Sequence, residues 1–262
     1  MRFASLGSGS EGNALLVESR DGARTARLMI DCGFGRREIE RRLHGAGCAP
    51  EQLDAILVTH EHGDHIGGVF RLARAHGIAV HLTHGTLRAV AGAPGLDQCG
   101  PLLRIIDSHA AFECAGLLVE PVPVPHDARE PVQYVIDDGR VRLGVLTDLG
   151  HGTPHVIRAL ARLQALVLEC NHDGELLAGN PSYPPVLKRR IAGPWGHLEN
   201  REAARILAAI DGQRLRTVVA AHLSQQNNRP ELARAALAGA LAARMADIQV
   251  ADQDQGVDWI EV

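Results

Sequence analysis

The sequence predicts an α+β protein in which two β-rich halves, each with helices on its outside, form one four-layer αββα sandwich. Short apolar runs typical of strands recur in both halves, segments with helical spacing lie between them, and residues 95–147 are β-rich. No repeat, low-complexity tract or linker divides the 262 residues. We therefore expect a single domain over 1–262.

The first half alternates between strand and helix patterns. Its short apolar runs, bounded by glycine and charged residues, predict strands at 3–8, 13–19, 26–33, 53–60 and 78–84. Apolar residues at helical spacing, such as Ile39 and Leu43 before a glycine stop, predict helices at 36–47, 65–77 and 85–93.

The second half starts with strands and then alternates again. Strands are expected at 102–107, 114–124, 132–138 and 141–148, with "DDGR" at 137–140 as a hairpin turn. Further strands are expected at 165–170, 216–222, 248–252 and 257–262. Helices are expected at 154–163, 201–210 and 229–245.

Composition excludes several classes of protein. A net charge of −4 argues against a uniformly basic nucleic-acid binder, although it leaves room for a local basic patch. No apolar run approaches the roughly 20 residues that span a bilayer, and the first ten residues lack the apolar core of a secretory signal. The five cysteines are widely spaced and form no C-x-x-C, so we expect reduced, mostly buried thiols in a cytoplasmic protein without a membrane partner.

The strongest chemical signal is "THEHGDHIGG" at 59–68, where a predicted strand ends and a helix begins. His60 and His62 alternate along an extended segment, so both side chains can face one metal ion. Asp64 and His65 open the following helix and can face a second ion. The alternative is a surface loop that happens to be rich in histidine, but four ligand-type residues at this density seldom assemble without a metal.

Three more ligand-type residues each follow an apolar strand pattern, and a sandwich would gather them at one rim: His126, Asp148 and His222. Five imidazoles and two carboxylates without a thiolate favour zinc, with manganese or iron as alternatives, over a structural cysteine site. A bridging carboxylate from Asp148 would hold two divalent ions about 3.5–4 Å apart, and such a pair supplies hydroxide near neutral pH.

This pattern of H-x-H-x-D-H followed by a later His, Asp and His resembles the signature of the metallo-β-lactamase superfamily, and the resemblance covers essentially the full chain. It implies the αββα metallo-β-lactamase fold. It also implies that His60, His62 and His126 bind one ion, that Asp64, His65 and His222 bind the other, and that Asp148 bridges the two.

The metals alone do not select a substrate, because this superfamily hydrolyses lactams, thioesters, lactones and phosphodiesters. Five phrases resemble the YycJ/WalJ-like branch, a group of nuclease-like phosphodiesterases: "SLGSGSEGNALLVE", "IDCGFGRREIERRL", "LVLECNHDGELL", "YPPVLKRRIAGPWGHLEN" and "AAHLSQQNN". The resemblance implies a phosphodiesterase that trims DNA or RNA from an end through a metal-bridging hydroxide.

Two other functions stay open from the sequence. One is a thioester or lactone hydrolase that uses the same hydroxide on a carbonyl carbon. The other is a catalytically silent, metal-bound interaction module, although degenerate family members would be expected to lose ligands.

Phosphodiester cleavage also needs a proton for the leaving oxygen, and His197 in "GPWGHLEN" is the candidate. The resemblance implies that a Glu pairs with this histidine, and Glu169 ends a predicted strand. We therefore assign His197 and Glu169 to catalysis together with Asp64. The structural alternatives are a helix-entry histidine bonded to backbone and a polar loop at 169–172. Residues that the same phrases place near the substrate are Ser8, Asn13, Asn171, His172 and Ser224.

The corner after His197 departs from the family pattern. Glu199 stands where the family has serine, so we expect Asn200 to cap the following helix. An acidic Glu199 beside His197 would repel a phosphate unless its side chain points away.

The best candidate for a phosphate-binding basic patch comprises Lys188, Arg189, Arg190 and Arg201. Ordinary solvated surface charge is an equally good explanation for this run of basic residues. With four Phe, two Tyr and two Trp, the chain offers no evident platform for stacked bases.

The glycine-rich stretch at 5–18 lacks the Lys-Ser/Thr pair of a phosphate-binding P-loop. We expect it to form a turn between two strands. The resemblance further implies that its backbone, from Ser8 to Asn13, reaches the rim of the metal cleft and contacts a substrate phosphate there.

Overall fold

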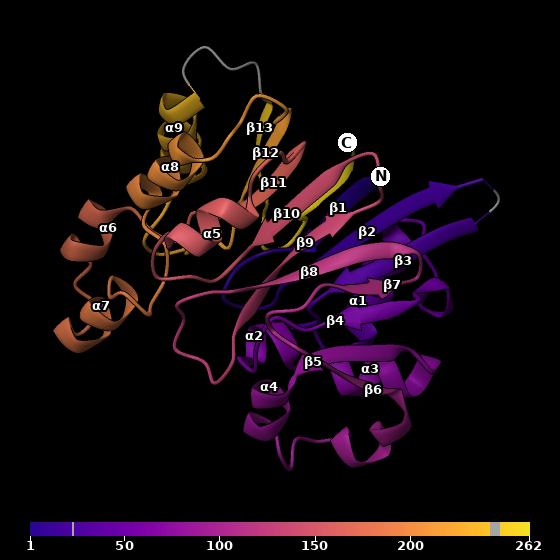
Figure 1. Cartoon of the computed structure of the whole chain (residues 1–262). Coiled ribbons are helices and arrows are strands. Elements are labelled where there is room, and N and C mark those ends of the chain that lie inside the picture. The colour runs from indigo at the N-terminus through magenta and orange to yellow at the C-terminus, as the bar shows by residue number, and fades with distance from the viewer. Residues whose placement is uncertain (23, 242–246) are drawn as a thin grey trace.

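The computed structural model describes residues 1–22, 24–241 and 247–262, and within them the chain forms two facing sheets with helices outside (Figure 1). The strands of the first sheet are β1 (Arg2–Gly7), β2 (Ala14–Asp21), β3 (Arg24–Ile30), β4 (Ala55–Leu57), β5 (Ala79–Thr83), β6 (Leu103–Ile106) and β14 (Val257–Glu261). Those of the second are β7 (Phe112–Cys114), β8 (Leu117–Pro123), β9 (Val132–Asp137), β10 (Arg142–Leu146), β11 (Ala165–Glu169), β12 (Thr217–Ala221) and β13 (Asp247–Val250).

The strands follow the order β14-β1-β2-β3-β4-β5-β6 in one sheet and β13-β12-β11-β10-β9-β8-β7 in the other. The helices of the first half are α1 (Arg36–Gly45), α2 (Gly63–Ile66), α3 (Val69–His76) and α4 (His84–Ala89). Those of the second half are α5 (Pro154–Ala159), α6 (Gly174–Gly179), α7 (Pro185–Ile191), α8 (Asn200–Ala209) and α9 (Pro230–Leu241). Three 3-10 turns also occur in the first half, at Pro50–Gln52, Leu96–Gln98 and Gly100–Leu102.

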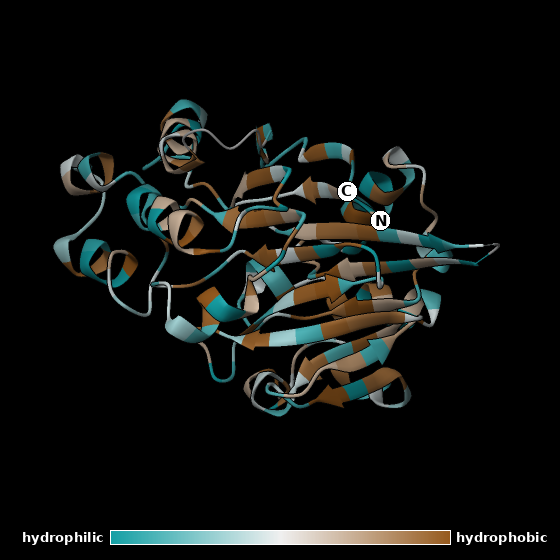
Figure 2. Cartoon of the chain, turned by 45° about the horizontal axis from the view of Figure 1, so that its top comes forward, coloured by the Kyte–Doolittle hydropathy of each residue, from teal (hydrophilic) through white to brown (hydrophobic). Residues whose placement is uncertain are grey.

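Three apolar cores separate the four layers. The central core joins side chains of both sheets, such as Leu57 and Val145, and is fully buried there. One outer core lies under α1 and α3, with Leu43 and Leu72, and the other lies under α8 and α9, with Ile206. Figure 2 shows hydrophobic residues along much of the strands and both hydrophobic and hydrophilic residues on the outer helices. The predicted αββα sandwich is therefore confirmed.

Parallel strands bring several strand ends to one edge of the sandwich. In the second sheet β10, β11 and β12 are parallel, with Leu146 opposite Leu168 and Glu169 opposite Ala221. In the first sheet β3, β4 and β5 are parallel, with Ile30 opposite Leu57. Because carboxyl ends of parallel strands meet at the same edge, residues just beyond these strands lie close together.

Some expected elements are divided. The predicted helix at 65–77 is broken at Gly67–Gly68 into the end of α2 and the whole of α3, because Gly68 lies against the backbone carbonyl of Phe34. The predicted strand at 114–124 is a hairpin, because Ala115 and Gly116 have φ angles of 56° and 87°. Two consecutive residues with positive φ are typical of a type I′ turn. Of the predicted helix at 229–245, residues 242–245 lie outside the described residues.

The expected cap of α8 is wrong. Glu199 occupies the N-cap position without a side-chain capping bond, and Asn200 is already the first helical residue. The amide of Asn200 instead exchanges two hydrogen bonds of 2.9 Å with the amide of Asn228. This buried pairing outcompetes the local capping bond. The helices α6 and α7 were not among the expected elements.

All five cysteines are buried and free, as expected. In the part of the chain that the structure describes, no helix is both long enough and apolar enough to cross a bilayer.

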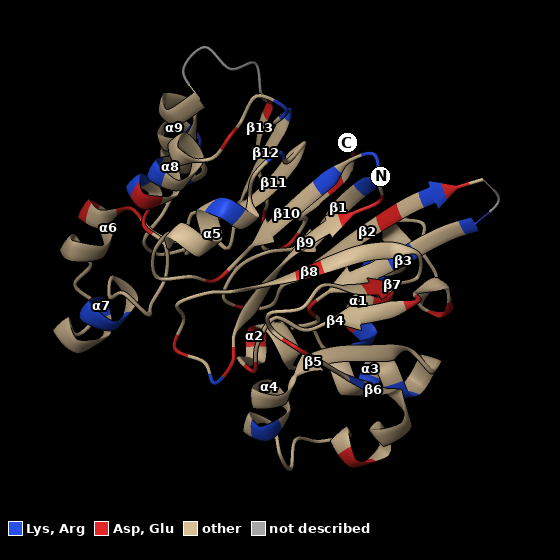
Figure 3. Cartoon of the chain, in the orientation of Figure 1, with Lys and Arg blue, Asp and Glu red and all other residues tan. Residues whose placement is uncertain are grey.

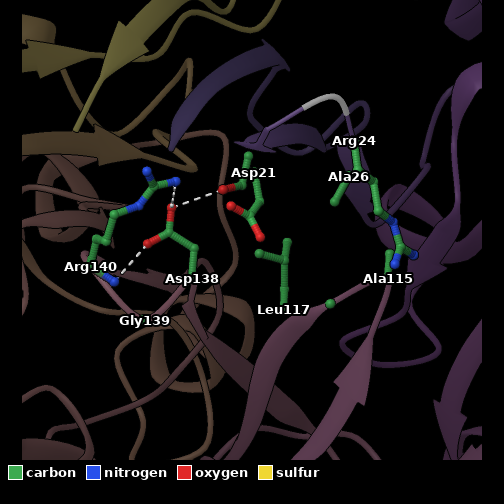
Figure 4. A pocket seen from close by; sticks show the side chains of 10 residues that line it. Asp21, Arg24, Ala26, Ala115, Leu117, Asp138, Gly139 and Arg140 are labelled. Carbon is green, nitrogen blue, oxygen red and sulfur yellow. Dashed lines mark hydrogen bonds and ion pairs between the residues drawn. The ribbon is translucent and has the colours of Figure 1, made fainter.

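A cavity of about 350 Å³ lies at the end of the sandwich away from the gathered strand ends, between the β2–β3, β7–β8 and β9–β10 turns (Figure 4). Its buried carboxylate, Asp138, accepts a bond from Ser19 and lies near Arg140. The cavity is thus a gap between hairpins whose central charge is already neutralised.

Gly33 fixes how the first sheet meets the loop at 59–68, since a Cβ added there would overlap the backbone carbonyl of Asp64. We expect Gly33→Ala to lower the free energy of unfolding by about 2–3 kcal/mol and to displace that loop. Urea denaturation, together with the metal content of the purified protein, measures both effects. The matched control is Gly35→Ala, where an added Cβ meets nothing within 4 Å and φ is −60°. Equal stability of the two variants would contradict this account.

Candidate metal centre and active site

The seven predicted ligand residues gather at the edge where the parallel strands end. Their nitrogen and oxygen atoms fall into overlapping groups, and within each group all such atoms lie within 4.8 Å of one another. The groups include His60–His62–His126, Asp64–His65–His222 and His60–His65–Asp148. Residues from both sheets therefore contribute to a single cluster.

The group of His60, His62 and His126 is drawn from the end of β4 and the segment after β8. Nε2 of His126 lies 3.2 Å from Nδ1 of His62, so two ring nitrogens face each other directly. The rings of His60 and His62 are in edge contact, with centroids 4.5 Å apart. Three imidazoles thus converge on one small volume.

The second group comes from α2 and the end of β12. Oδ2 of Asp64 lies 3.2 Å from Nε2 of His222 and 3.5 Å from Nε2 of His65. Asp148 lies between the two groups, because its Oδ2 is 2.6 Å from Nε2 of His65 and 3.5 Å from Nε2 of His60. A carboxylate oxygen in that position can serve both groups.

The buried carboxylate of Asp31 orients two of these imidazoles. Its Oδ2 accepts a bond of 2.8 Å from Nδ1 of His65, which leaves Nε2 of that ring free to coordinate. The same oxygen accepts the Thr59 hydroxyl at 2.8 Å. Because that hydroxyl has one hydrogen, it must accept from Nδ1 of His60 at 2.9 Å, which again leaves Nε2 as the ligand atom.

His126 is oriented by backbone rather than by a carboxylate. Its Nδ1 donates to the carbonyl oxygen of Gly196 at 3.0 Å, so its Nε2 carries the lone pair that faces His62. Each of the three oriented rings therefore directs its Nε2 toward the centre of the cluster.

The buried carboxylates of the site need positive charge beside them. Burial raises the pKa of Asp148, but the neighbouring His222 and His65 outweigh burial and hold that pKa well below its usual range. Burial lowers the pKa of His222, yet Asp148 and Asp64 raise it to about 9. Protons on imidazole thus balance the carboxylates, and divalent cations would take the place of these protons on binding.

The residues fit a pair of divalent ions. Nε2 of His60 is buried and forms no hydrogen bond among the described residues. Burial and the neighbouring His65 hold the pKa of His60 well below its usual range, so a proton does not satisfy this nitrogen either. A buried lone pair without a partner is costly, and coordination would satisfy it. A donor set of imidazoles and carboxylates suits transition metals.

His197 lies beside the cluster and is paired as predicted. Its Nδ1 is 2.8 Å from Oε1 of Glu169 and 2.8 Å from Oδ1 of Asp148. Glu169 is fully buried, and its other oxygen accepts the backbone N–H of Leu149 at 2.8 Å. Burial lowers the pKa of His197, but Asp148 and Glu169 outweigh it and raise that pKa well above the usual range. Without metal, the ring is therefore a cation with Nε2 directed away from these carboxylates.

A cleft of about 250 Å³ opens onto the cluster, and we call it the metal cleft. Its lining includes Ser10, His62, Asp64, Asp127, Arg190 and His197. Ser10 belongs to the loop between β1 and β2, so the glycine-rich stretch is a strand-to-strand turn that reaches this cleft.

The residues expected to contact substrate are largely buried and already bonded. The Ser8 hydroxyl accepts the backbone N–H of His222 at 2.8 Å, and the Asn171 amide donates to the His222 carbonyl at 3.0 Å. Asn13 donates to the carbonyl of Gly9 at 3.0 Å and lies 3.2 Å from Nε2 of His65. These contacts position ligand residues.

His172 is buried as well, whereas Ser224 is half-buried. Burial lowers the pKa of His172 to about 4, and its Nδ1 has no hydrogen-bond partner in the described part of the chain. The backbone N–H of Ser224 donates to the Asn171 carbonyl at 2.8 Å, and its hydroxyl accepts from Asn227.

The Glu199 side chain does not line the metal cleft. Its Oε1 lies close to where a Cβ on Gly174 would stand and 3.9 Å from Nε of Arg201. The expected repulsion of a phosphate at this corner is therefore removed.

Three contributors were not identified from the sequence: Asp31, Asp127 and the Gly196 carbonyl. Asp31 is the first residue beyond β3. It therefore follows the same pattern that identified Asp148, namely a ligand-type residue just after an apolar strand; we call this pattern the strand-end rule. Asp127 accepts a bond of 2.7 Å from Arg190, and its other oxygen is 3.5 Å from Nε2 of His126. A backbone carbonyl such as that of Gly196 leaves no signal in a sequence.

Comparison with known proteins gives two kinds of match. A family model described as a β-lactamase superfamily domain matches residues 26–222. The exodeoxyribonuclease WalJ of Streptococcus pneumoniae is 32% identical over 98% of this chain and 92% of its own length. The exodeoxyribonuclease YycJ of Bacillus anthracis is 34% identical over 89% of this chain and 86% of its own length.

Among solved structures, Zn²⁺-bound PqqB from Methylobacterium extorquens aligns over the whole of both chains with a TM-score of 0.75 and 18% identity. At that identity the similarity establishes the fold alone, and it is the metallo-β-lactamase fold.

We expect Asp31→Asn to weaken metal binding by about 10- to 100-fold, because an amide cannot hold both His65 and Thr59 in their present hydrogen-bonding roles. Competition with a chromophoric chelator measures the affinity. Asp97→Asn, at an exposed aspartate, is the matched control. Unchanged affinity in the Asp31 variant would show that the imidazoles orient themselves without it.

Proposed function

The chain belongs to the metallo-β-lactamase superfamily, and from this premise we propose that it is a metal-dependent phosphodiesterase that removes nucleotides from an end of DNA or RNA. The observation that carries the proposal is the 2.8 Å contact of His197 with Glu169 beside the seven-residue cluster. A buried carboxylate behind an imidazole at the wall of a cleft forms a proton donor for a leaving oxygen. The names of the two similar exodeoxyribonucleases support a nucleic-acid substrate.

In this proposal the cluster holds two divalent ions, zinc in preference to manganese or iron. His60, His62 and His126 would hold one ion, and Asp64, His65 and His222 would hold the other, with Asp148 as a ligand close to both groups. When bound, the ions supply positive charge next to the phosphate and a hydroxide nucleophile near neutral pH.

The chain's own residues do the remaining work. Glu169 and Asp148 keep a proton on Nδ1 of His197, so Nε2 is the nitrogen that delivers a proton to the leaving oxygen. Arg190 at the cleft wall places a cation near the non-bridging phosphate oxygens. Asn13 and Asn171 act through the imidazoles that they position.

We expect His197→Ala to retain both metal ions and to lower the turnover number on DNA by about 10²- to 10⁴-fold. Steady-state assays on a labelled oligonucleotide, paired with elemental analysis, measure the two quantities. His155→Ala, at an exposed histidine of α5, is the control and should match the unaltered protein. Full activity with metal retained in the His197 variant would overturn the assigned role.

Elemental analysis joined to a panel of substrates tests the reaction itself. We expect about two ions per chain and hydrolysis of 5′-phosphorylated DNA, RNA or a bis-aryl phosphate. Removal of the ions by a chelator should abolish hydrolysis and lower the melting temperature, because ions that bind only the folded state stabilise it. Turnover of a thioester or a lactone without turnover of any phosphodiester would favour the carbonyl hydrolase instead.

A further inference from the structure

The segment from α7 to His197 exposes apolar side chains next to the metal cleft. Within the described residues five large hydrophobic side chains are exposed, and two of them lie here: Val186 at 70% and Trp195 at 59%. Figure 1 shows α7 extending beyond the sheets, so neither sheet covers it. An exposed tryptophan beside a reactive cleft is an unusual use of the largest apolar side chain and points to a ligand.

A rigid turn carries Trp195. The backbone N–H of Gly196 donates to the Gly193 carbonyl at 3.0 Å, which closes a four-residue turn with Pro194 in its second position. The Pro194 carbonyl accepts from Nδ1 of His151 at 3.0 Å. A ring held on a fixed turn loses little conformational entropy when it binds a flat partner.

The turn is continuous with the metal cleft. Gly196 lines the cleft, and its carbonyl orients His126. Leu187, Arg190 and Ile191 of α7 also line the cleft, so its wall has apolar as well as cationic groups. A molecule that lies on α7 can therefore extend to the metal ligands without leaving the protein surface.

The charge of α7 is wholly basic. Its last turn carries Lys188, Arg189 and Arg190, and the helix has no acidic residue (Figure 3). Arg189 is exposed and forms no ion pair with an acid among the described residues. Arg190 pairs with Asp127 at the cleft and is 64% exposed, so a phosphate can reach it from solvent.

We propose that α7 and the following turn, residues 185–196, form a docking surface for single-stranded polynucleotide. An unpaired base stacks on Trp195, and the phosphates contact Arg189 and Arg190. This rests on the proposed function, and it adds that the strand must be single near the site, because inside a duplex both faces of a base are already stacked on its neighbours. The combination of one aromatic platform with a basic track is how proteins bind single strands without sequence preference.

An anionic membrane surface would also attract exposed apolar and basic groups, but the cleft favours a polymer. Leu187 and Arg190 of α7 line the cleft itself, so an occupant of the cleft contacts them. A strand of nucleic acid can occupy the surface and the cleft together, whereas a bilayer cannot enter a cleft of about 250 Å³.

Fluorescence of Trp195 tests stacking directly. Trp259 is the second tryptophan; its indole N–H donates to the Ala46 carbonyl at 2.9 Å and Arg2 covers its ring, so Trp259→Phe leaves Trp195 as the single reporter. The metal-loaded variant is titrated with a hydrolysis-resistant phosphorothioate oligothymidylate and with an abasic strand of equal length. We expect quenching by the base-containing strand and little by the abasic one. Equal signals from the two strands, or none from either, would overturn stacking.

Kinetics provide the second test. We expect Trp195→Ala to raise KM on single-stranded DNA by about 5- to 100-fold, with Trp195→Phe recovering much of the loss. A bis-aryl phosphate is too short to reach the turn, so its hydrolysis reports damage to the active site alone. A larger loss of activity on DNA than on this diester supports docking, and equal losses of activity on the two substrates overturn it.

The salt dependence of binding reports the phosphate contacts. We expect Arg189→Ala to reduce the slope of log K against log salt by about 0.7, whereas Arg214→Ala, before β12 at the opposite edge, leaves it unchanged. An unchanged slope in the Arg189 variant would remove this residue from the surface.

The outcomes separate the two proposals. If the metal-loaded protein cleaves oligonucleotides but the Trp195 variants match it, the docking surface is wrong and the proposed function stands. If the protein cleaves no oligonucleotide, the proposed function fails first. If Trp195→Ala weakens binding to anionic vesicles but not binding to oligonucleotides, the surface binds lipid and the proposal is overturned.

Discussion

The carboxylate of Asp31 is the interaction on which the rest of the site depends. It lies at 2% exposure and accepts bonds from the Thr59 backbone, the Thr59 hydroxyl and the His65 ring, so it ties the ends of β3 and β4 to α2. Its φ of 60° is left-handed, a conformation that aspartate tolerates better than most residues. An imidazole can present either nitrogen, and this one acceptor fixes the choice for His60 and His65.

The second sheet must likewise hold its own site residues in fixed positions. The ends of β10, β11 and β12 deliver Asp148, Glu169 and His222, and the parallel register places them side by side. The distance between these residues and the imidazoles of the first sheet is set by the central core, where side chains of both sheets interlock. Since such a core tolerates small volume changes poorly, packing far from the ligands controls the geometry of the ligands themselves.

The strand-end rule explains what the sequence could predict. His126, Asp148 and His222 each follow an apolar run, so the fold and the gathering of the seven ligand-type residues are both predictable from the order of residues along the chain. Asp31 obeys the same rule, but a lone aspartate after a strand is also typical of a turn. Asn200 looked like a helix cap, and only a distant residue, Asn228, decides otherwise. Helices α6 and α7 are short and lie among prolines and glycines. Their sequences therefore show no helical periodicity of apolar residues from which they could be predicted.

The exposed surface and the metal site share one stretch of backbone. The His197 N–H donates to the Ile191 carbonyl at 2.8 Å, and a Cβ on Gly196 would overlap the carbonyls of Arg190 and Ile191. The last turn of α7 is therefore packed directly on the residue that orients His126 and on the residue that pairs with Glu169. In the proposed docking mode, a strand on α7 would meet the metal ligands at a fixed offset, because α7 packs directly on Gly196 and His197. A fixed offset of this kind would serve the proposed removal of nucleotides from an end.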